Sequence, residues 1–144
     1  MHALETIHGL LKPGGRLIDI HPRGLPTPLY ALEAAESGLL GYIQETDDFI
    51  EYRQADEAIQ KVLSRNMYGL MDEEVFAYST YASSLEELSE HLKETWSDAI
   101  LEDSIWQKAE QLGVARYSPL PADIRRIQMV EQIGICVLLP LRSM

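Results

Sequence analysis

Basic residues are scarce in this chain, which has 12 lysines and arginines against 23 aspartates and glutamates among its 144 residues. The formal net charge of -11 would repel phosphate backbones and anionic lipid, which disfavours nucleic acid and membrane as partners. Long apolar runs are also lacking: the longest, near residues 133–141, is broken by Gly134 and Pro140 and falls short of the roughly 20 residues of a membrane span. Since no basic segment followed by an apolar one opens the sequence, we expect no signal peptide and a cytoplasmic location.

Cysteine occurs once, as Cys136, which excludes an internal disulfide. Its apolar neighbours Ile135 and Val137 favour a buried, inert thiol over a reactive one. No histidine has metal-ligand spacing to another histidine or to the cysteine, so we expect no bound metal. The histidines are His2, His8, His21 and His91.

The remaining composition is that of a globular protein, with 46% hydrophobic and 24% charged residues. A length of 144 residues suffices for one domain with a hydrophobic core and is short for two. We therefore expect residues 1–144 to form a single domain.

Periodicity along the first half predicts two helices and two or three strands. Apolar residues at helical spacing indicate a helix over 3–11, and the following Pro13-Gly14-Gly15 ends it. Residues 16–21 alternate as a short strand. A hairpin turning near Ser37-Gly38, with 39–45 as its second strand, is the preferred interpretation of the next segment. Asp48 then precedes a clear amphipathic helix that reaches about residue 65.

In the second half, aromatic and β-branched residues indicate a strand over 75–81, with Tyr78 and Tyr81 in the core. Ser84 followed by Glu87 has the capping-box spacing, and the apolar stripe behind it continues to Ile100. A short helix over 104–112 is expected to close at Gly113. The almost uncharged segment 127–139 is typical of a strand buried within a sheet. We therefore predict an α/β fold, a mixed sheet of about four or five strands with helices packed on it.

The stretch Ala3–Ile20 resembles one piece of class I S-adenosylmethionine-dependent methyltransferases. In that family a helix ends in Leu-Lys-Pro-Gly-Gly, as it does here at residues 11–15, and the fifth strand of the sheet follows directly. Proline and paired glycines stop the helix and reverse the chain tightly. The later order of predicted elements is similar to the family's second half, in which a helix, a sixth strand, further helices and a long antiparallel seventh strand follow.

The chain departs from the family in what precedes this turn. The family holds its cofactor on a glycine-rich turn after the first strand and on an acidic residue ending the second, both upstream of Lys-Pro-Gly-Gly. Only eleven residues precede that turn here, and G-x-G-x-x-G is absent. The resemblance thus implies S-adenosylmethionine for the full-length family, while we expect no cofactor to be bound by this chain alone and assign it no cofactor-binding or catalytic residue.

Ligands of open α/β sheets bind beyond the carboxyl ends of the parallel strands. The predicted strand 16–21 carries Asp19 and His21 on one face there, and Arg23 follows. We therefore regard these three as substrate-pocket candidates, with His21 as a possible base and Arg23 as a possible anion contact. The alternative is purely structural, with His21 bound to a neighbouring backbone group and Asp19 paired with an arginine.

Two tyrosines complete the set of candidates. Tyr30 and Tyr42 fall in the irregular region that the family uses to cover its substrate, so they are either pocket residues or surface packing. Trp96 and Trp106 lie within apolar helical stripes, which favours core packing over ligand stacking.

Three functional interpretations remain open. The chain is a methyltransferase-like carboxyl-terminal segment without activity of its own, a small-ligand or protein-interaction module, or one half of a two-chain methyltransferase. If 16–21 is the family's fifth strand, its usual fourth-strand neighbour is missing and one edge is unpaired. Exposed edges invite pairing with another chain, so we expect a homodimer or higher oligomer, a chain supplying the missing half, or the amino-terminal helix over this edge.

Overall fold

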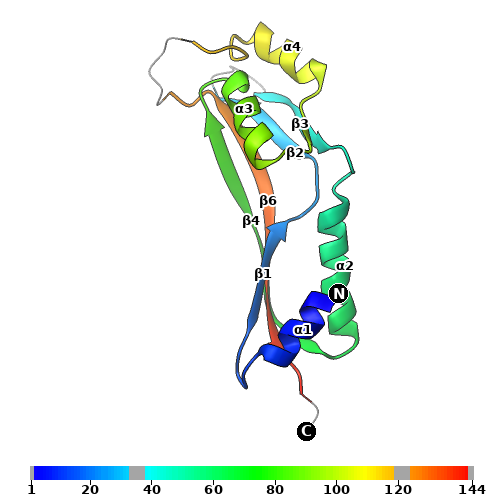
Figure 1. Cartoon of the computed structure of the whole chain (residues 1–144). Coiled ribbons are helices and arrows are strands. Elements are labelled where there is room, and N and C mark those ends of the chain that lie inside the picture. Colours follow the sequence, from blue (N-terminus) through cyan, green and yellow to red (C-terminus); the bar gives the residue numbers. More distant parts are fainter. Residues whose placement is uncertain (1, 33–37, 119–123, 143–144) are drawn as a thin grey trace. The chain divides into compact units, whose positions relative to one another are not determined.

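The computed structural model describes residues 2–32, 38–118 and 124–142, and these ranges contain four helices and six strands (Figure 1). Contacts within the chain divide it into two compact units, which we describe separately. Unit 1 comprises Met1–Gly24, Ile50–Phe76 and Gln132–Met144, and unit 2 comprises Leu25–Phe49 and Ala77–Glu131. Two long strands, β4 (Tyr68–Ala82) and β6 (Ile127–Pro140), supply a segment to each unit.

Unit 1 consists of strands covered on one face by two helices. Helices α1 (His2–Leu10) and α2 (Ile50–Ser64) lie beside one another against β1 (Leu17–Pro22) and the adjoining parts of β4 and β6 (Figure 1). Both helices and β1 were predicted to within about two residues, because their apolar spacing is local and regular.

The core of unit 1 is small and joins all five elements. Its buried residues are Ile59, Val62, Tyr68, Cys136 and Leu138, and leucines of α1 and β1 pack around them. The Tyr68 hydroxyl donates a hydrogen bond to the Leu4 carbonyl at 2.8 Å, so the largest core side chain also fixes α1 through a polar contact.

Strand pairing differs from the prediction in two respects. In the part of the chain that the structure describes, all pairings are antiparallel and the strands number six, where we expected a mixed sheet of about four or five. Strand β6 pairs with β1, Leu17 opposite Leu138, and also pairs with β4. Because β6 lies between β1 and β4, those two strands never become neighbours. A pairing that joins residues 17 and 138 leaves no trace in local periodicity, which is why the sequence does not reveal it.

Unit 2 is built on a hairpin and two helices. Strands β2 (Thr27–Ala31) and β3 (Leu39–Glu45) pair antiparallel, and β2 also pairs with the start of β6. The hairpin was predicted, although Ser37 of its expected turn lies outside the described residues. Helices α3 (Leu85–Thr95) and α4 (Asp103–Gln111) enclose with these strands a core centred on Leu29, Ile43, Leu88 and Ile105.

The start of α3 confirms the predicted capping interaction. The Ser84 hydroxyl accepts a hydrogen bond from the Glu87 backbone N–H at 3.1 Å. The Glu87 carboxylate in turn accepts from the backbone N–H of Ser83 at 2.6 Å, one residue earlier than in the usual capping box. The same carboxylate accepts a bond from the Ser83 hydroxyl at 2.6 Å, and the hydroxyl and backbone bonds from Ser83 together lower the pKa of Glu87.

Three expectations for the second half were wrong. Helix α3 ends at Thr95, and Ile100 belongs to the short strand β5 (Ala99–Ile100) rather than to its apolar stripe. Strand β4 begins at Tyr68, well before Val75, because its charged segment 72–74 can stay in solvent while the backbone remains paired. Its tyrosines Tyr78 and Tyr81 are exposed. By contrast, Trp96 and Trp106 pack against the core of unit 2 as predicted.

Candidate functional site

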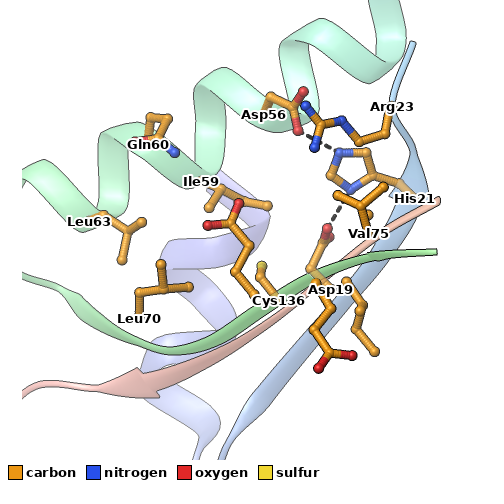
Figure 2. Close-up of a pocket in the computed structure, with 14 residues that line it drawn as sticks. Asp19, His21, Arg23, Asp56, Ile59, Gln60, Leu63, Leu70, Val75 and Cys136 are labelled. Carbon is orange, nitrogen blue, oxygen red and sulfur yellow. Dashed lines mark hydrogen bonds and ion pairs between the residues drawn. The ribbon is translucent and has the colours of Figure 1, made fainter. Parts of the chain in front are cut away.

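A cleft of about 250 Å³ opens in unit 1 between the strands and α2 (Figure 2). Strands β1, β4 and β6 and helix α2 all contribute to its lining, and α2 and β4 each supply both polar and apolar side chains. The titratable side chains of this lining include those of Asp19, His21, Arg23, Asp56, Glu73 and Cys136.

His21 is held between two carboxylates. Its Nδ1 bonds to Oδ1 of Asp19 on the same face of β1, and its Nε2 lies 2.7 Å from Oδ1 of Asp56 on α2. A carboxylate can only accept, so both bonds are satisfied together only when both ring nitrogens carry protons. Burial lowers the pKa of His21, but the hydrogen bonds to Asp56 and Asp19 outweigh it and raise the pKa above its ordinary 6.5. We call this arrangement the His21 clamp.

The clamp limits the chemistry open to His21. A doubly protonated imidazole has no lone pair, so it can act as a base only after it releases a proton. The purely structural role that the sequence also suggested was wrong about both bonding partners. His21 bonds to two carboxylates instead of a backbone group, and Asp19 pairs with His21 instead of an arginine.

Cys136 lies at the base of the cleft, directly opposite Asp19 in the pairing of β1 with β6. Its side chain is buried, as predicted. Burial raises the pKa of the thiol, and the negative charges of Asp19 and Glu73 raise it further. Since the thiolate is the nucleophilic form, burial and these charges disfavour reaction at Cys136.

The structure brings together three of the five predicted site residues. Asp19, His21 and Arg23 all line the cleft, whereas Tyr30 on β2 and Tyr42 on β3 belong to unit 2 and do not line it.

Asp56 was missed by the sequence reasoning. It lies four residues after Tyr52 and three before Ile59, which places a carboxylate on the apolar face of α2. An acidic residue within an otherwise apolar stripe is the signal that would have identified it.

The described residues fit neither a metal ion nor S-adenosylmethionine. Within the described ranges, no set of three or more histidine, cysteine or acidic side chains is placed to hold a metal ion. For S-adenosylmethionine, the paired glycines Gly14 and Gly15 lie between a helix and the start of β1. The strand, glycine-rich turn and helix that cradle an adenosyl group have the opposite order, so this turn does not fit the cofactor.

Comparisons with protein families, curated proteins and solved structures find no match for this chain. None of the helices in the described residues is both long and apolar enough to cross a bilayer.

Proposed function

We propose that this chain is the carboxyl-terminal, substrate-side half of a class I methyltransferase-like fold and does not transfer methyl groups by itself. The observation that carries the proposal is the path of the chain through unit 1. Within unit 1, the elements that come after β1 are α2 and then β4, because β2 and β3 belong to unit 2. The long last strand β6 pairs with both β1 and β4. Because each runs antiparallel to β6, β1 and β4 are parallel to one another.

This path supports the resemblance beyond the turn that first indicated it. A strand, a helix, a second strand, further helices and a long antiparallel strand is the element order of the family's second half. In the proposed correspondence, β1, β4 and β6 are its fifth, sixth and seventh strands, and β2 and β3 form a hairpin inserted after the fifth.

The geometry of the turn supports the same correspondence. Gly14 has φ of 79°, a conformation that disfavours residues with a side chain. A Cβ on Gly15 would lie 2.9 Å from the Lys12 carbonyl oxygen, which accepts the hydrogen bond from the Gly15 N–H at 2.8 Å. Both glycines are therefore required by the backbone, as the motif implies.

Binding of S-adenosylmethionine is the part of methyl transfer that the proposal does not assign to this chain. Its cradle belongs to the family's first half, and the glycines present here close a helix instead of opening one. We therefore propose that activity requires that first half, joined to this chain or supplied by a second one. The cleft containing Asp19, His21 and Arg23 would then be on the substrate side.

Titration calorimetry of the purified chain with S-adenosylmethionine tests the proposal. We expect no saturable heat and no rise in melting temperature at concentrations where a complete class I methyltransferase, run in parallel, is saturated. Extending the chain with an in-frame upstream segment that encodes a glycine-rich strand-to-helix turn should restore binding. Saturable binding or methyl transfer by the unextended chain would overturn the proposal.

A further inference from the structure

The edge of β1 that faces away from β6 is open. Among the described residues, β6 is the one strand paired with β1, and the pairing runs without a break from Leu17 opposite Leu138 to Pro22 opposite Ile133. In a regular antiparallel pair, only every second residue directs its N–H and C=O at the partner strand. The other residues direct theirs at the opposite edge.

One hydrogen bond shows which residues of β1 direct their backbone groups at β6 and which direct them at the open edge. The Arg23 N–H donates to the Gln132 carbonyl at 2.9 Å, and these two residues continue the register of the pair. Arg23, His21 and Asp19 therefore take the hydrogen-bonded positions, and the N–H and C=O groups of Ile18 and Ile20 point to the open edge. Pro22 fits this pattern, since it also falls in the outward set and has no N–H to lose.

The side chains of the same two residues are exposed. Ile18 is 57% and Ile20 is 58% accessible, on the face of β1 opposite the helices. Opposite them on β6 lie Val137 and Ile135, so the apolar surface continues across the strand pair. Free backbone groups beside exposed isoleucines are the features through which an edge strand pairs with another chain. The charged side chains of β1, Asp19 and His21, lie on its other face, toward α2.

We infer that a second copy of this chain pairs with this edge, β1 against β1 in antiparallel orientation, about a two-fold axis at Ile20. Under two-fold symmetry both copies use the same edge, so the edge of one copy pairs with the identical edge of the other. Three registers set an isoleucine of one copy opposite an isoleucine of the other, namely those centred on Ile18, Asp19 or Ile20. The inference does not rest on the proposed function, because it uses only the geometry and the charges of β1. It concerns the 144-residue chain without the family's first half, whose fourth strand would occupy the same edge.

Charge selects among the three registers. Centring on Asp19 sets that carboxylate against its copy, and like charges directly opposite are destabilising. Centring on Ile18 sets Leu17 against Asp19 of the second copy. Centring on Ile20 places Asp19 opposite His21 of the second copy, twice, and these are the narrow positions where side chains lie closest. The protonated imidazole then faces carboxylates from both chains.

Backbone bonds define the extent of this interface. Ile20 exchanges two hydrogen bonds with its copy, and each Ile18 N–H reaches the Pro22 carbonyl of the second chain. Because Pro22 has no N–H to donate, the ladder ends there. A single short strand pair buries less area than a standard stable interface, so we expect a weak dimer with a dissociation constant of about 1 µM to 1 mM.

Oligomeric state gives the first test. Sedimentation velocity of the 144-residue chain should show a monomer–dimer equilibrium over that concentration range. A double substitution, Ile18→Lys with Ile20→Lys, should give a monomer, while Leu10→Lys, at an exposed leucine of α1, should leave the equilibrium unchanged. A chain that stays monomeric at the highest concentration would overturn the inference. The open edge would then be available for pairing with a strand of another protein.

Disulfide trapping tests the register with substitutions that preserve the fold. In the proposed register, two copies of residue 20 have Cα atoms about 5.5 Å apart, within the span of a disulfide, while the Cα atoms of two copies of residue 18 are about 14 Å apart. Under mild oxidation, Ile20→Cys should give at least about tenfold more linked dimer than Ile18→Cys. Equal linkage, or preference for Ile18→Cys, overturns the register.

Discussion

Replacing His21 with asparagine should destabilise the protein in a way that depends on pH. The imidazole bonds to Asp19 on β1 and to Asp56 on α2, so it joins a strand to a helix through two charge-assisted hydrogen bonds. Asparagine is close in size but carries no charge and cannot reach both carboxylates. The variant therefore leaves two carboxylates without the cation between them.

The magnitude follows from how exposed each partner is. A hydrogen bond to a charged group contributes about 1.5–3 kcal/mol when it is protected from solvent. The Asp19 and His21 side chains are 29% and 17% exposed, so their bond should contribute near the lower end of that range. The Asp56 side chain is 54% exposed, and screening reduces its contribution to at most about 1 kcal/mol. We expect a total loss of about 2–3 kcal/mol near pH 6, or about 5–10 °C in melting temperature.

The direction of the pH dependence follows from the raised pKa. Because the pKa of His21 is higher in the folded protein than its ordinary 6.5, folding favours the protonated form. The clamp's contribution is therefore fully present below the unfolded-state pKa and is lost as pH rises through the folded-state pKa. Above it, a neutral ring donates to one carboxylate only and turns a lone pair toward the other.

Urea denaturation of wild type and His21→Asn from about pH 5.5 to pH 9 measures this effect. The difference in unfolding free energy should be largest at low pH and shrink as pH rises. Glu57→Gln, at the exposed neighbour of Asp56 on α2, serves as the control and should show a small change. A difference for His21→Asn that stays constant across the range would refute a charged clamp, since it would mean that size alone explains the loss.

Two further substitutions test other parts of the fold by the same denaturation assay. Ser84→Ala removes the side chain that caps α3 and should cost about 1 kcal/mol; a neutral result would show that water replaces the cap. Gly41→Ala should cost about 2–4 kcal/mol, because its φ is 153° and a Cβ would meet Ile105 Cγ1 at 2.7 Å. Gly9→Ala is its matched control within α1, where a Cβ meets nothing within 4 Å, and should stabilise by about 0.5–1 kcal/mol; equal effects at both glycines would contradict the packing argument.

Helix and strand positions were largely predictable because they depend on neighbours in sequence. The stripe of α2 and the Ser84 cap of α3 each involve residues within one or two turns, and the steric demands of Gly14-Gly15 are local as well. These features follow from periodicity and backbone chemistry alone. Where a local pattern was interrupted, as by the charges at 72–74 of β4, the predicted strand began too late.

The site was predictable only in part because it depends on long-range pairing. Asp19, His21 and Arg23 could be grouped from their spacing on one strand. Asp56, 35 residues beyond His21, meets them only through the packing of α2 on β1. Tyr30 and Tyr42 were grouped with the site by resemblance alone, and neither lines the cleft.

The alternation of β1 gives the His21 clamp a second consequence. Leu17, Asp19 and His21 face the helices, and Ile18 and Ile20 face away. A slip of one residue against β6 would turn the isoleucines toward α2 and place Asp19 and His21 on the open face. Apolar burial alone would tolerate that slip, because isoleucine packs at least as well as the residues it replaces. The slipped strand would lose both bonds to His21 and leave Asp56 unpaired, so the clamp, more than the hydrophobic pattern, specifies the register of β1.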